Sequence, residues 1–139
     1  VNMAVASEKL ERLYAEKQEQ LEQDVEQLKK QYDTAGLSDE LLKKMLVFVY
    51  FYIELFEETG ADVLSTECWT AMPQAFGANP CLAMSILADM GYIVTCESDI
   101  HGAVTNALLM CASRGKMPPL FGEFTCRNPI NRHSELLWH

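Results

Sequence analysis

The sequence predicts an α/β protein in which two amino-terminal helices precede a βαβαβ unit with a parallel, Rossmann-like open sheet. Residues 7–32 and 38–59 carry helical patterns, and each pattern ends at a nearby glycine. After Gly60, short apolar runs alternate with helical segments, which is typical of parallel strands joined by helical crossovers. The chain is therefore expected to consist of a helical segment, residues 1–60, and an α/β portion, residues 61–139, that is only part of a domain.

The first helix is expected from Ser7 to Tyr32, because this stretch is rich in Glu, Gln, Lys and Leu and holds no Gly or Pro. One stripe of side chains follows it at spacings of four and three, made of Tyr14, Gln18, Leu21, Val25, Leu28 and Tyr32. The stripe fits a coiled-coil contact with another subunit. It fits an amphipathic helix that lies on its own domain at least as well.

A second helix is expected to begin after Ser38 and to run to about Thr59. Ser38 is a suitable N-cap, and Asp39 and Glu40 favour the positive end of the helix dipole. The middle of this segment, residues 46–53, is apolar all round and resembles a strand. Its length and its flanking signals favour a helix that is buried on most sides.

The α/β portion is expected to hold strands at residues 62–66, 92–95, 120–124 and 135–138, with helices at 81–90 and about 99–113. Parallel strands present their carboxyl ends at one edge of a sheet, where ligands bind in open α/β folds. Glu67, Glu97 and Glu123 each lie at or near such an end. His139 joins them if the last strand is also parallel.

Two carboxylates and an imidazole at one edge suit a divalent cation that prefers oxygen ligands. The imidazole favours Mn²⁺ or Co²⁺ over Mg²⁺. Such a metal polarises a substrate carbonyl and hydroxyl while a neighbouring carboxylate moves a proton. Acids at strand ends also cap helices, and this is the role expected of Asp99. Glu67 is either solvated or paired with an arginine.

The other reactive residue types are expected to have ordinary roles. His101 lies in the first turn of a helix and His133 in a polar loop, so both are expected at the surface or in packing contacts. The sequence holds five cysteines and no Cys-x-x-Cys pair, which favours reduced, buried thiols in a cytoplasmic protein over a disulfide framework or a zinc knuckle. Cys96 is expected to be a buried thiol, since the carboxylate of Glu97 would raise its pKa and make it a poor nucleophile.

Composition limits the partners. The net charge of −9 argues against nucleic acid or an anionic membrane as a partner, and the longest apolar run, Met45–Ile53, is too short to span a bilayer. The helical stripe and the aromatic run Phe48–Tyr52 offer more apolar surface than a small sheet covers, so a homo-oligomer is expected.

Ordered motifs lie between residues 61 and 139, namely Cys68-Trp69, Asn79-Pro80-Cys81, the run from Gly91 to Asp99, Phe121-Gly122-Glu123 and Leu137-Trp138-His139. Together they resemble the L-fucose/L-arabinose isomerase superfamily, and its fucose-isomerase-like members in particular. Residues 1–60 match only loosely, as helices that lead into the catalytic domain.

This resemblance implies an aldose–ketose isomerase, an intramolecular oxidoreductase that works through a cis-enediol while Mn²⁺ chelates the first two sugar oxygens. It implies that Glu97 and Glu123 bind the metal and exchange protons, and that His139 is a metal ligand. The implied substrate is a monosaccharide, an aldopentose or a 6-deoxyaldose. Glutamate at position 123 resembles the arabinose isomerases, since fucose isomerases have aspartate there.

The resemblance also implies missing parts. Full-length members carry a domain on each side of this region, so the chain is expected to be a fragment that is inactive in isolation. The alternative is a non-catalytic assembly or regulatory module that keeps the sugar-isomerase fold and associates through its first helix.

Overall fold

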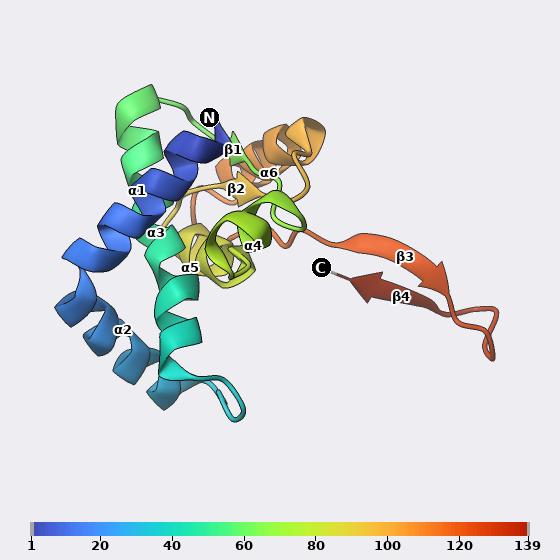
Figure 1. The fold of residues 1–139 in the computed structure, drawn as a ribbon. Coiled ribbons are helices and arrows are strands. Elements are labelled where there is room, and N and C mark those ends of the chain that lie inside the picture. Colours follow the sequence, from blue (N-terminus) through green and yellow to red (C-terminus); the bar gives the residue numbers. More distant parts are fainter. Residues whose placement is uncertain (1, 139) are drawn as a thin grey trace.

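The computed structural model describes residues 2–138 and shows a protein of mixed helical and β structure (Figure 1). The side chains of Glu123 and Trp138 lie outside this description. The elements follow the chain in the order α1 (Met3–Glu16), α2 (Gln18–Gln31), α3 (Asp39–Thr59), β1 (Leu64–Ser65), α4 (Ala71–Phe76), α5 (Cys81–Asp89), β2 (Val94–Thr95), α6 (Ile100–Ala112), β3 (Glu123–Arg127) and β4 (Glu135–Trp138).

The first predicted helix is two helices. Lys17 has φ −105° and ψ 23°, and this non-helical backbone separates α1 from α2. The bend lets both helices pack against α3 (Figure 1). Leu21, Val25 and Leu28 of the predicted stripe are buried there. Much of the stripe is therefore covered by this chain's own α3, as in the second of the two interpretations given above.

Helix α3 is the centre of the core, and its predicted bounds are confirmed. The Ser38 hydroxyl accepts a hydrogen bond from the Leu41 N–H at 3.2 Å, and Gly60 ends the helix with a left-handed φ of 62°. Phe48 is fully buried and its ring centroid lies between 5.7 and 6.4 Å from those of Phe51, Tyr52 and Phe76. No helix within residues 2–138, α3 included, has the length and apolarity that crossing a membrane requires.

The parallel sheet is smaller than predicted. Strands β1 and β2 pair in parallel, with Leu64 opposite Val94 and Ser65 opposite Thr95. Strands β3 and β4 instead pair antiparallel with each other, in a separate sheet that projects from the helices (Figure 1). The prediction of a βαβαβ parallel sheet is thus wrong after its first crossover. Residues 123–127 and 135–138 pair with each other as a hairpin, which needs no crossover helix.

Helices α5 and α6 agree with the predicted segments. Helix α5 begins at Cys81, directly after Pro80, and α6 begins after Asp99. The strand expected at residues 92–95 is shorter, since only Val94 and Thr95 form the ladder. The short helix α4 was not predicted. Together, β1, α4, α5 and β2 form one β-helix-β crossover that sets the position of the candidate site.

Candidate functional site at the carboxyl edge of the parallel strands

Each parallel strand is followed by a turn that carries a glutamate. Ser65 pairs with Thr95, so Glu67 and Glu97 occupy equivalent positions two residues beyond the paired strand ends. The Ser98 N–H donates a hydrogen bond of 3.0 Å to the Thr66 carbonyl and ties the two turns together. The prediction that these two acids follow strand ends at the same edge is confirmed.

Glu97 lies on an unusual backbone. Glu97 and Ser98 both have φ 57°, in the left-handed region, which costs a residue with a Cβ roughly 1 kcal/mol or more. The Glu97 side chain is exposed and forms no ion pair with any other residue that the structure describes. Its carboxylate is therefore accessible at the edge where a ligand would bind.

The neighbouring acids have local partners. The Asp99 carboxylate accepts a hydrogen bond of 2.9 Å from the Gly102 N–H, which confirms its predicted role as the cap of α6. Glu67 is exposed, in agreement with the solvated alternative. It accepts a hydrogen bond from the hydroxyl of Thr70, three residues along the chain, and forms no ion pair with a described arginine.

For the other two predicted metal ligands, the structure describes only the backbone of Glu123. Glu123 is the first residue of β3, so it belongs to the antiparallel hairpin and not to the parallel strands. The parallel-edge argument for Glu123 is therefore wrong, although its side chain lies outside the described structure. His139 also lies outside the described residues. The set of Glu97, Glu123 and His139 stays a prediction.

The remaining histidines lie at the surface. His101 is exposed in the first turn of α6, where its carbonyl accepts a hydrogen bond of 2.8 Å from the Thr105 hydroxyl. His133 is exposed in the loop between β3 and β4, and its N–H donates to the Asn131 side chain at 3.1 Å. Both agree with the ordinary roles expected of them.

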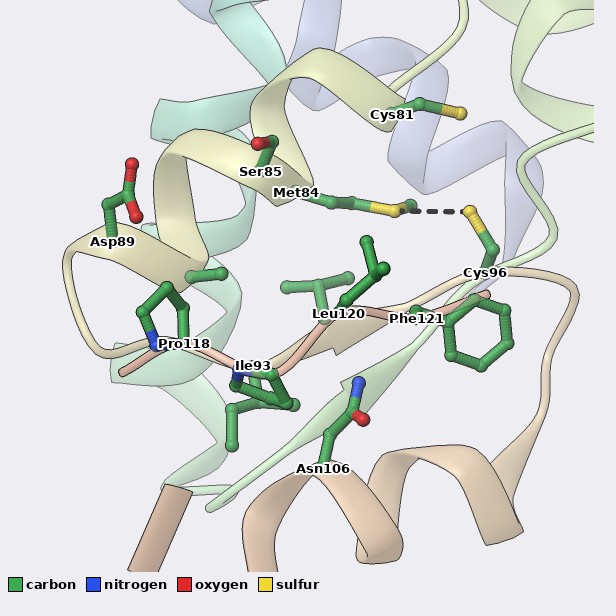
Figure 2. Close-up of a pocket in the computed structure, with 13 residues that line it drawn as sticks. Cys81, Met84, Ser85, Asp89, Ile93, Cys96, Asn106, Pro118, Leu120 and Phe121 are labelled. Carbon is green, nitrogen blue, oxygen red and sulfur yellow. Dashed lines mark hydrogen bonds between the residues drawn. The ribbon is translucent and has the colours of Figure 1, made fainter. Parts of the chain in front are cut away.

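A cavity of about 380 Å³ adjoins the edge (Figure 2). It lies among α5, the strand β2, Asn106 of α6 and the segment 118–121. Its volume falls within the range of roughly 300–1,000 Å³ that is usual for small-molecule sites, and most of its lining is apolar. Glu97 does not line the cavity, whereas the adjacent Cys96 does.

Sequence reasoning missed a cluster of three thiols at this edge. The Sγ atoms of Cys68, Cys81 and Cys96 lie within 4.8 Å of one another. The expectation of buried thiols is confirmed for Cys68 and Cys96, and Cys81 is half-buried. It is wrong for the other two cysteines, Cys111 and Cys126, which are exposed. The positions of the cysteines in the sequence could have revealed the cluster, because two of the three follow parallel strands and the third is the first residue of the crossover helix.

The thiols contact one another. A hydrogen bond with Cys81, then burial and a hydrogen bond with Cys68, raise the pKa of the Cys96 thiol above its usual range. Cys96 also donates to the Met84 thioether, with 3.3 Å between the sulfur atoms (Figure 2). The predicted direction of this pKa shift is correct, but its cause is the neighbouring thiols and burial rather than Glu97.

Curated proteins that this chain is similar to are sulfoquinovose isomerases. The chain is 28% identical to those of Priestia aryabhattai and Priestia megaterium and 30% identical to that of Alkalicoccus urumqiensis, in each case over 116 residues. The matched region is 84% of this chain and 26% of each relative, so the chain spans about a quarter of their length. No protein-family model matches the sequence, and no solved structure does.

Proposed function

We propose that this chain is part of a metal-dependent aldose–ketose isomerase. The observation that carries the proposal is the similarity to three sulfoquinovose isomerases over 84% of the chain. The exposed carboxylate of Glu97, at the carboxyl edge of two parallel strands, supports it. Since the match covers 26% of each relative, the proposal assigns the activity to a longer polypeptide that supplies further sugar-binding groups.

The proposed substrate is an aldose that carries a sulfonate. Sulfoquinovose, named in the relatives, is a 6-deoxyaldose with a sulfonate on carbon 6. It therefore falls within the wider class of 6-deoxyaldoses that the motifs imply. A sulfonated sugar is the first substrate to test, with unsulfonated 6-deoxyaldoses and aldopentoses as comparisons.

In this proposal Glu97, Glu123 and His139 would hold Mn²⁺, with Co²⁺ or Mg²⁺ as alternatives. The structure describes the side chain of one member of the set, and Glu97 fits the role as an exposed carboxylate without an ion pair among the described residues. When bound, the cation polarises the carbonyl and hydroxyl oxygens of the sugar.

The two glutamates would move the proton. An aldose becomes its ketose when the proton on carbon 2 is removed and a proton is added to carbon 1, while one proton also passes from oxygen 2 to oxygen 1. One carboxylate would take the proton from carbon 2 while oxygen 1 gains a proton, which gives a cis-enediol. Protonation of carbon 1 with loss of the proton from oxygen 2 would then give the ketose. Glu97 and Glu123 are assigned to these steps, since both lie in the motifs that carry the resemblance.

The test uses the protein encoded by the complete reading frame. We expect Glu97→Gln to lower ketose formation at least about 100-fold, because an amide cannot accept the proton, and to leave the circular dichroism spectrum unchanged. Ketose formation is measured with sulfoquinovose, 6-deoxyaldoses and aldopentoses, with and without Mn²⁺. Glu57→Gln is the matched control, as it makes the same change at an exposed site on α3.

Two further results bear on the proposal. His139→Ala is expected to weaken metal binding, with part of the activity restored by added Mn²⁺. Near wild-type turnover by Glu97→Gln on the best sugar would remove the mechanism. No ketose from any of these sugars, with any of the three metals, would favour the non-catalytic module instead.

A further inference from the structure

We propose that Cys68, Cys81 and Cys96 form a binding site for Zn²⁺. This site uses none of Glu97, Glu123 and His139, so the proposal does not depend on the proposed isomerase activity. It rests on the convergence of the three thiols, on a buried hydroxyl beside them, and on the cavity that gives access to two of them.

The spacing of the sulfur atoms fits a metal. Tetrahedral Zn²⁺ with bonds of about 2.3 Å to sulfur places its thiolates roughly 3.8 Å apart. The three Sγ atoms already lie within 4.8 Å of one another, so shifts of about 1 Å or less bring each pair to that spacing. A disulfide needs about 2.05 Å between two sulfur atoms and leaves the third without a role.

The ligands come from three fixed points of the fold. Cys96 directly follows β2, Cys68 lies in the turn after β1, and Cys81 is the first residue of α5. The positive end of the α5 dipole favours a thiolate at Cys81. The crossover from β1 to β2 therefore brings the three sulfur atoms together before any metal binds.

A second observation points to a ligand. Tyr52 of α3 is 1% exposed, and its buried hydroxyl finds no hydrogen-bond acceptor among the described residues, although the Thr66 side chain interacts with its oxygen. Burial raises the pKa of this hydroxyl, the Thr66 side chain lowers it, and the nearby thiols of Cys96, Cys68 and Cys81 raise it further. A metal-bound thiolate accepts hydrogen bonds, so zinc binding would give the Tyr52 hydroxyl the acceptor that the protein alone does not supply.

Charge and access select the ion. Thiolate and thioether ligands favour Zn²⁺ and Cu⁺ among biological metals. Three thiolates leave one net negative charge around Zn²⁺ and two around Cu⁺, and burial penalises the larger charge. Among residues 2–138, no Lys, Arg or His lines the cavity beside Cys81 and Cys96 to offset it.

Each ligating thiol releases its proton to solvent, and the cavity leaves room for the Met84 thioether or a water as the fourth ligand.

The chain is titrated with Co²⁺ as a spectroscopic probe and then with Zn²⁺. We expect one ion per chain, the near-ultraviolet absorption of cobalt–thiolate bonds, and its loss when Zn²⁺ displaces Co²⁺. Zinc should also protect three of the five cysteines from a thiol reagent. Cys81→Ser should weaken zinc binding at least about 100-fold, whereas Cys111→Ser, the same change at an exposed cysteine of α6, should bind as the parent does.

Tyr52→Phe separates a metal site from simple packing. It should weaken zinc binding about tenfold by removing the hydrogen bond to a thiolate, and without metal it should unfold at no lower a temperature than the parent. Glu97→Gln should keep the cobalt–thiolate absorption, even where isomerase activity is lost. Three results would overturn the proposal. The first is a reduced parent without that absorption, and the second is its loss in Cys111→Ser as well as in Cys81→Ser. The third is binding of Cu⁺ without Zn²⁺.

Discussion

At the residue scale, Gly102 shows how closely the segments around the candidate site approach one another. A Cβ at this position would lie 2.5 Å from the Asp99 carboxylate and 2.6 Å from the Phe121 ring. Both distances are shorter than van der Waals contact allows. The missing side chain therefore permits Asp99 to cap α6 while Phe121 covers the first turn of that helix.

Gly102→Ala is expected to destabilise the chain by about 1–3 kcal/mol, because the methyl group overlaps Asp99 and Phe121. Without the overlap, the same substitution inside a helix would stabilise by roughly 0.5–1 kcal/mol, so the sign of the change tests the contact. Urea unfolding measures it, and His101→Ala at the exposed neighbouring position is the control. A more stable Gly102→Ala variant would contradict the packing described here.

At the element scale, capping residues in the sequence specify the ends of α3 and α6. The bend between α1 and α2 has no such residue. Ser38, Gly60 and Asp99 define ends of α3 and α6, and the structure confirms each of them. The bend at Lys17 has no glycine or proline. It follows from packing, because α1 and α2 each bury apolar side chains against α3.

Ser38→Ala is expected to lower the free energy of unfolding by about 1 kcal/mol, since the Leu41 N–H loses its hydrogen-bond acceptor. Ser38→Asp should keep the parent's stability, because aspartate also accepts this hydrogen bond and suits the helix dipole. Thermal unfolding of the two variants measures the difference. Equal losses in both would mean that the cap contributes nothing measurable to α3.

At the scale of the whole molecule, the exposed apolar surface lies on α6 and the β3–β4 hairpin. The sequence predicted it on the first helix and the aromatic run Phe48–Tyr52. Phe48, Phe51 and Tyr52 are buried inside the core rather than left for a partner. Helix α6 instead exposes Ile100 by 69% and Leu108 by 66%, and the hairpin exposes Ile130 by 95%. An exposed apolar helix face of this kind is typical of surfaces that contact another chain or another domain.

The homo-oligomer stays a prediction, and its expected interface moves to α6. We expect the isolated chain to self-associate, and Leu108→Lys to lower its weight-average mass in sedimentation equilibrium by placing a charge on that face. Tyr32→Lys is the control, as Tyr32 is 59% exposed at the end of α2. A compact monomer at high concentration in the parent chain would count against association through α6.

The division of the chain at residue 60 also stays a prediction, although the structure shows what crosses it. Helix α3 lies before that boundary and packs on α5, which follows it. Buried residues of both helices belong to the same apolar cluster. The helical segment therefore contributes to the surroundings of the thiol cluster, chiefly through Tyr52.

The sequence by itself determined the ends of α3 and α6, the position of Glu97 after β2, and the capping role of Asp99. These features depend on hydrogen bonds and backbone preferences within a few residues, so local residue types specify them. Only the tertiary structure decided that β3 pairs with β4 and that Cys68, Cys81 and Cys96 meet. Strand pairing and side-chain convergence depend on which distant segments pack together, and a local residue pattern does not specify that.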